Sequence, residues 1–136
     1  MSAPDAAPRR TTGLGRVLVA LYAVFAIAAL SRASVQIATD FHTAPLAYLL
    51  SAFAGVVYVL ATVGLGRSGA RWRRVAWVAC SVELLGVLTV GTLSLADAQA
   101  FPRSTVWSGY GSGYVFIPLV LPVLGLVYLR RESRAA

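Results

Sequence analysis

Glu83 is the residue whose type and surroundings are best suited to chemistry. It lies in the apolar run 75–96, VAWVACSVELLGVLTVGTLSLA, which at about 1.5 Å per residue is long enough to cross a bilayer. An ionised group at such a depth costs about 3 kcal/mol or more unless it is paired or hydrated. Two interpretations stay open. Glu83 exchanges a proton or cation, or it is a protonated acid that hydrogen-bonds across helices and contributes about 1–2 kcal/mol to a bundle.

Other reactive groups are scarce. The sequence contains no nucleophile triad, phosphate loop or pair of catalytic carboxylates. Asp40 and His42 are too few for a metal site, and the single cysteine, Cys80, excludes an intramolecular disulfide or a cysteine-based metal cluster in a monomer. We therefore expect no enzymatic activity, no cofactor and no metal.

The composition is that of a membrane protein. Hydrophobic residues make up 58% of the 136 residues and charged residues only 12%, whereas soluble domains carry about a quarter charged residues. The net charge of +7 does not indicate nucleic-acid binding, because the basic residues are dispersed between apolar runs. All twelve basic residues are arginine, which together with the alanine content suggests a bacterial genome rich in GC.

Four apolar runs predict an all-α fold, a polytopic membrane protein with four transmembrane helices in an antiparallel bundle. The expected helices cover about 17–38, 44–66, 75–96 and 113–129, within a transmembrane domain of 17–130. Residues 1–16 and 131–136 are expected to be cytoplasmic tails, the first of them disordered. A cleaved signal peptide is an alternative for the first run, although Arg32 fits poorly into a cleavage site.

The arginines are distributed unequally on the two sides of these runs. Ten fall on one side: Arg9, Arg10, Arg16, Arg67, Arg71, Arg73, Arg74, Arg130, Arg131 and Arg134. Only Arg32 and Arg103 fall on the other. By the positive-inside rule, both termini are expected to be cytoplasmic, in a bacterial cytoplasmic (inner) membrane.

Distances along the helices suggest which polar groups share a level. Glu83 lies about 13 Å above Arg74, and Tyr58 lies about 12 Å from Gly66, so the Tyr58 phenol is expected to meet the carboxyl group. Tyr22 is a further candidate neighbour. Arg32 lies about 11 Å further out than Glu83, which argues against a direct ion pair.

Arg32, Gln36 and Asp40 share one face of the first predicted helix. This stripe could line an outward-facing vestibule, or its members could satisfy one another at the interface. The second interpretation is the one we favour.

The segment 97–112 contains Gly109-Tyr110-Gly111 shortly after Thr105 and Val106. Potassium-channel filters carry a contiguous TVGYG, but Trp107 and Ser108 interrupt that order here. We instead expect an aromatic belt at the outer interface, although a re-entrant or docking loop stays open. The residues of this predicted outer aromatic loop are Phe101, Trp107, Tyr110 and Tyr114.

Two further patterns concern helix packing. Ala47, Ser51 and Gly55 recur every four residues, and such a small-residue stripe allows close approach of a helix in this chain or in another. Pro118 and Pro122 are expected to kink the last helix.

The chain resembles small four-helix integral membrane proteins of actinobacterial type. The resemblance rests on the Arg- and Ala-rich tails and on the stretch FPRSTVWSGYGSGYVFIPLVLPVLGL, and it implies no activity. Small multidrug-resistance transporters also combine four helices with one membrane glutamate. Theirs lies in the first helix, where this chain has none.

These observations lead to two expectations for function. The first is a membrane protein without enzymatic activity, an accessory or scaffold subunit that contacts lipid and a membrane-protein partner or a second copy of itself. The alternative is a small proton-coupled transporter with Glu83 as its exchange site.

Overall fold

The computed structural model describes residues 13–97, 99 and 103–135, and within these residues all regular structure is helical. The expected all-α fold class is confirmed. Most of the predicted tail 1–16, as well as Phe101, lies outside the described residues.

The first half of the chain forms a helical hairpin. Helix α1, Gly13–Asp40, is followed by the short 3-10 helix η2, Phe41–Thr43, and by α2, Pro45–Gly66. Pro45 occupies the first turn of α2, where its missing N–H removes no intrahelical hydrogen bond. Helix α1 is longer at both ends than the expected 17–38.

Helix α3, Ala70–Ala96, begins five residues before the expected start at Val75. The apolar run marks where the bilayer begins, but alanine and arginine are good helix formers and extend the helix beyond it. The reversal before it uses Gly69, whose φ of 110° suits glycine.

The last helix does not have the expected bounds of 113–129. Residues Ser108–Tyr114 form the 3-10 helix η4, and α4 covers only Ile117–Ala135. Left-handed backbone at Val115 and Phe116 separates the two, and their axes differ by 99°. Pro118 therefore lies in the first turn of α4 and Pro122 alone lies inside the helix.

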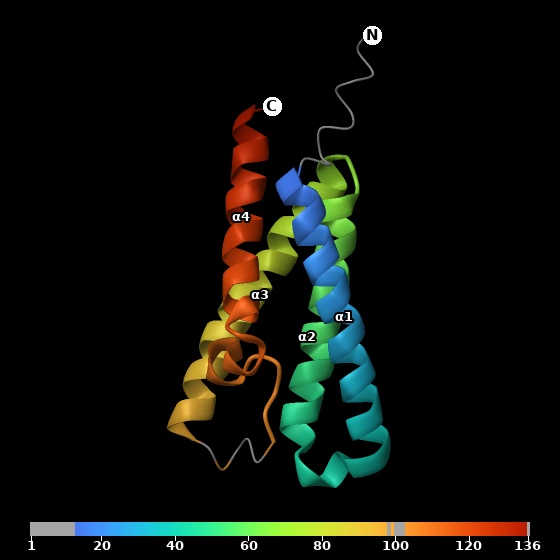
Figure 1. Ribbon diagram of the computed structural model, residues 1–136, viewed down its shortest axis with the longest axis vertical. Helices are drawn as coiled ribbons and strands as arrows, with labels where there is room; N and C mark the ends of the chain where they lie inside the picture. Colours follow the sequence, from blue (N-terminus) through green and yellow to red (C-terminus); the bar gives the residue numbers. More distant parts are fainter. Residues whose placement is uncertain (1–12, 98, 100–102, 136) are drawn as a thin grey trace.

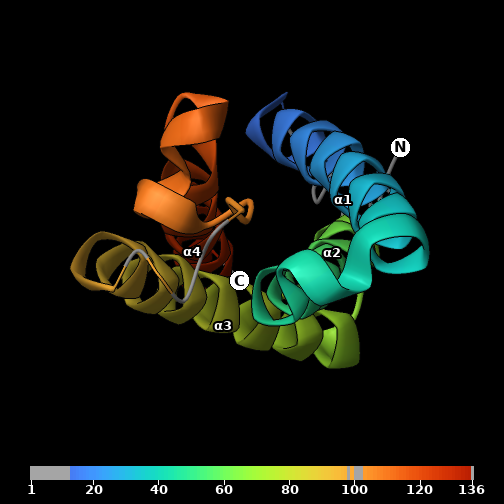
Figure 2. The same cartoon turned by 90° about the horizontal axis from the view of Figure 1, so that it is seen from below.

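The helices are antiparallel and follow one another in space as they do in sequence. In Figure 1 the chain ends of α1 and α4 lie at the same end of the molecule. Figure 2 shows α1 beside α2, α2 beside α3, and α3 beside α4. The loop before α4 folds back against α3.

Three helical segments are long and apolar enough to cross a membrane: Gly13–Thr43, Pro45–Gly66 and Ala70–Ala96. A fourth span exists if η4 and α4 are counted as one bent segment. The protein is thus a multi-pass membrane protein by length and composition.

Candidate functional site

Glu83 lies at the centre of the bundle and is completely buried, with 0% of its surface exposed. Its Oε1 accepts a hydrogen bond of 2.6 Å from the hydroxyl of Tyr22. Because Tyr22 belongs to α1 and Glu83 to α3, this bond connects two helices that are not consecutive in the chain.

The Tyr22 hydroxyl also contacts Cys80, with 3.6 Å between oxygen and Sγ. Cys80 lies three residues before Glu83, which places both side chains on one face of α3. Helix α4 closes this side with Gly125, where a Cβ would come within 2.7 Å of the Cys80 Sγ. Three helices therefore meet around the Tyr22 hydroxyl.

The second carboxyl oxygen of Glu83 is in a different situation. Oε2 is buried, and none of the described residues offers it a hydrogen bond. A carboxylate with one hydrogen bond and no solvent would be costly, so the arrangement suits a neutral carboxylic acid.

Tyr58, the expected neighbour of Glu83, makes its hydrogen bond to another residue. Its hydroxyl accepts a hydrogen bond of 2.9 Å from the indole Nε1 of Trp107, and its ring packs beside that of Tyr22 with centroids 6.0 Å apart. Tyr58 is nonetheless close to the Glu83 carboxyl group, as expected, but no hydrogen bond joins the two side chains. Tyr22, the further candidate, faces the carboxyl group.

Trp107 does not belong to an outer aromatic belt, so the prediction for this residue is wrong. Only 1% of its surface is exposed, and it lies edge-on to Tyr58 and Phe53. The missing side chain of Gly86 makes room for it, because a Cβ there would lie 2.5 Å from the indole Cζ3. The loop before α4 therefore enters the bundle, as in the re-entrant alternative.

Tyr110 and Tyr114 also turn inward from this loop. The Tyr110 ring covers Gly91, and its hydroxyl is 2.9 Å from that of Thr92. The Tyr114 ring packs against Phe25, with centroids 5.6 Å apart. Both tyrosines are only half-buried, so for them an outer aromatic belt stays a prediction.

The stripe of Arg32, Gln36 and Asp40 does not satisfy itself. The Arg32 guanidinium donates to the Tyr114 hydroxyl at 2.7 Å, and Asp40 accepts a hydrogen bond of 2.9 Å from Tyr48. The Gln36 Oε1 is buried without a hydrogen bond from any described residue. The favoured interpretation of this stripe is therefore wrong, and each member has its own surroundings.

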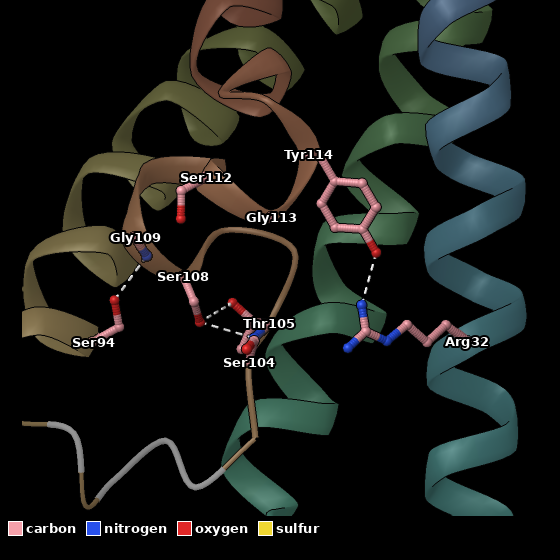
Figure 3. Close-up of a pocket in the computed structure, with 9 residues that line it drawn as sticks. All are labelled: Arg32, Ser94, Ser104, Thr105, Ser108, Gly109, Ser112, Gly113 and Tyr114. Carbon is pink, nitrogen blue, oxygen red and sulfur yellow. Dashed lines mark hydrogen bonds between the residues drawn. The ribbon is translucent and has the colours of Figure 1, made fainter.

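The alternative interpretation, a vestibule, fits Arg32 better. A pocket of about 490 Å³ lies between α1, α3 and the loop before α4 (Figure 3). Its lining residues are mostly small and polar: Arg32, Ser94, Ser104, Thr105, Ser108, Gly109, Ser112, Gly113 and Tyr114. Sequence reasoning singled out Arg32 and Tyr114 but missed the serines, whose only signal was their density between residues 104 and 112.

The small-residue stripe packs inside the chain. Ala47, Ser51 and Gly55 are buried. A Cβ on Gly55 would lie 2.6 Å from Cδ2 of Leu30 on α1. The helix that the stripe accommodates is therefore α1 of the same chain.

The described residues contain no group of three or more His, Cys, Asp or Glu side chains placed to hold a metal ion. His42 instead packs against Phe41, with ring centroids 5.7 Å apart.

No protein-family model, curated protein or solved structure matches the chain. Fold and composition define an all-α multi-pass membrane protein, and any more specific function has to be argued from the Glu83 network and the Arg32 pocket.

Proposed function

We propose that the protein is a membrane component without enzymatic activity, an accessory or scaffold subunit of a membrane assembly. The observation that carries this proposal is the burial of Glu83. The side chain has no exposed surface, and its carboxyl group is engaged by Tyr22 on another helix. A hydrogen bond between α1 and α3 is a structural use of this acid.

The proposed setting is the bacterial cytoplasmic membrane, with both termini in the cytoplasm. The excess of arginine on the side of the termini supports this orientation. The position of the chain ends of α1 and α4 at one end of the molecule is consistent with it (Figure 1).

The surface offered to a partner differs from the one that the sequence suggested. Since Ala47, Ser51 and Gly55 pack on α1, a partner or second copy would contact the outward faces of the helices or the polar ends. Apolar side chains such as Leu49, Phe53 and Leu60 are exposed on α2, where lipid or a partner helix can cover them.

A small proton-coupled transporter is the second candidate, and one observation favours it. The buried Oε2 of Glu83 has no hydrogen-bond partner among the described residues, and such atoms in native proteins often meet water or an ion.

Replacing Glu83 with glutamine separates the two candidates. Gln keeps the shape and can accept the Tyr22 hydrogen bond, but it cannot exchange a proton. We expect E83Q to reach wild-type levels in the membrane and to co-purify with the same proteins as wild type. The measurement is affinity purification from native membranes with identification of bound proteins, with E132Q as the matched control.

A measurement of proton flux can refute the scaffold proposal. Wild type, E83Q and E132Q are reconstituted in liposomes that contain a pH-sensitive dye. A proton flux in wild type and E132Q that is lost in E83Q would refute the scaffold proposal and establish the transporter. If no flux is found in any of the three proteins and a defined protein co-purifies, the scaffold proposal is supported.

A further inference from the structure

The pocket beside Arg32 has the chemistry of an anion site. Its volume of about 490 Å³ falls within the range of about 300–1,000 Å³ typical of small-molecule sites. Of the nine lining residues one is charged, Arg32, and none is acidic. Figure 3 shows the Arg32 guanidinium on one side of the pocket and the loop serines on the other.

Arg32 is exposed on α1 and stands some way inside the helix from its outer end. Arg32 is about 12 Å along α1 from the end of the helix at Asp40. Within the described part of the chain, its guanidinium donates a hydrogen bond to the neutral hydroxyl of Tyr114. A guanidinium has five N–H donors, so donors beyond the one bound to Tyr114 can serve an anion in the pocket.

The wall opposite Arg32 is held in place by hydrogen bonds of its own. The Ser94 hydroxyl donates to the carbonyl of Gly91 and accepts from the N–H of Gly109, at 2.8 and 2.9 Å. The Ser108 hydroxyl accepts from the backbone N–H of Thr105 at 2.8 Å. The loop therefore presents its hydroxyl groups from a fixed backbone.

We propose that this pocket binds a phosphate group, carried either by a phospholipid headgroup or by a small soluble phosphorylated molecule. The planar fork of a guanidinium matches two phosphate oxygens. The exposed hydroxyls of Ser104 and Ser112 can donate to a third oxygen. The negative charge of the phosphate compensates that of Arg32.

The first experiment tests the soluble source. The full chain in micelles of a maltoside detergent, which contains no phosphate, is titrated with inorganic phosphate and with glycerol 3-phosphate at constant ionic strength, and thermal unfolding is followed. A ligand that binds only the folded state raises Tm with concentration. We expect R32Q to weaken binding about tenfold or more, because it removes a charge-assisted bidentate contact.

Arg103 provides the matched control. It is the other arginine on this side of the molecule, it is exposed, and it does not line the pocket. R103Q is expected to bind like wild type. An equal loss in R103Q and R32Q would show nonspecific attraction to charge and overturn the proposal.

The second experiment tests the lipid source. The same proteins are placed in phosphatidylcholine nanodiscs with and without phosphatidylglycerol, and retained lipid is identified by native mass spectrometry. Retention of either phospholipid by wild type but not by R32Q, without a response to soluble phosphates, assigns a lipid headgroup. The opposite pattern assigns a soluble ligand, and no response in either experiment refutes the site.

If R32Q does not purify as a single folded species, S112A and R32K replace it. Ser112 is exposed outside the helical core, so its loss leaves the fold intact. Each is expected to weaken binding about threefold to tenfold, since one removes a hydroxyl donor and the other keeps the charge but loses the fork. Unchanged affinity in both would overturn the proposal.

Discussion

At the scale of single residues, the central feature is the hydrogen bond between Tyr22 and Glu83. It joins α1 to α3 between two completely buried side chains. The Cys80 sulfur and the backbone of Gly125 are the other neighbours of the Tyr22 hydroxyl. Removing that hydroxyl leaves the buried acid without its partner.

We predict that Y22F lowers the free energy of unfolding by about 1–3 kcal/mol, the cost of leaving a buried polar group unsatisfied. The measurement is reversible unfolding in mixed micelles, or the shift of Tm in detergent. Y110F is the control, because it removes a hydroxyl whose contact with Thr92 is exposed; its expected loss is about 0.5 kcal/mol. Similar losses in the two variants would show that the buried Tyr22 hydrogen bond stabilises the protein no more than the exposed one of Tyr110.

The sequence was sufficient to identify Glu83 and its level, but not its hydrogen-bond partner. Rise per residue converts sequence distance into depth, and depth correctly separated Glu83 from Arg32. The partner depends on how each helix is rotated about its axis. That rotation is decided by close contacts such as Gly125 with Cys80, which involve different helices and leave no local signal.

At the scale of elements, α2 and α3 cross at unusually short range. A Cβ on Gly64 would lie 2.8 Å from the backbone nitrogen of Ala76 and 3.0 Å from the carbonyl oxygen of Trp72. Both are backbone atoms, so a side chain cannot be accommodated by a change of rotamer. Gly64 thus allows the two helices to approach beside the arginine-rich connection.

We predict that G64A destabilises the protein by about 1–3 kcal/mol, the usual cost of overpacking. G66A is the matched control two residues away, where an added methyl group would lie 3.9 Å from its nearest atoms, on Val19. It is expected to change stability by less than about 0.5 kcal/mol. Thermal unfolding of both variants in one detergent measures the difference, and equal effects would contradict the close crossing.

The first three helices were predictable because each is a continuous apolar run. The bounds of the last helix were not predictable, because the apolar residues of its run are divided between a re-entrant loop and a short helix. Glycines at 109 and 111 and left-handed backbone at Val115 and Phe116 produce the break. The inward position of Trp107 depends on the missing side chain of Gly86, which lies on another element.

At the scale of the whole molecule, charge and chain direction agree. The arginine bias places the termini and the connection between α2 and α3 on one side. Figure 1 places the connection between α2 and α3 at the same end of the molecule as the start of α1 and the end of α4.

This topology predicts which introduced cysteines react with a membrane-impermeant maleimide. Q99C lies at the end opposite the termini and is expected to be labelled in intact cells, whereas S68C is expected to react only after permeabilisation. Both positions are exposed. The parent chain provides the background, because its one thiol, Cys80, is buried. Partial labelling of both variants in intact cells would indicate insertion in two orientations.

The brevity of α4 has a consequence for biogenesis. Its apolar part, 117–129, covers only about 20 Å, whereas a bilayer core measures about 30 Å. The remaining depth is covered by loop backbone, which the hydrocarbon tolerates only when protein surrounds it. We therefore expect the C-terminal segment to enter the membrane after α1, α2 and α3 have assembled. The order of insertion is then set by α4, the span that is too short to cross the bilayer without the other helices around it.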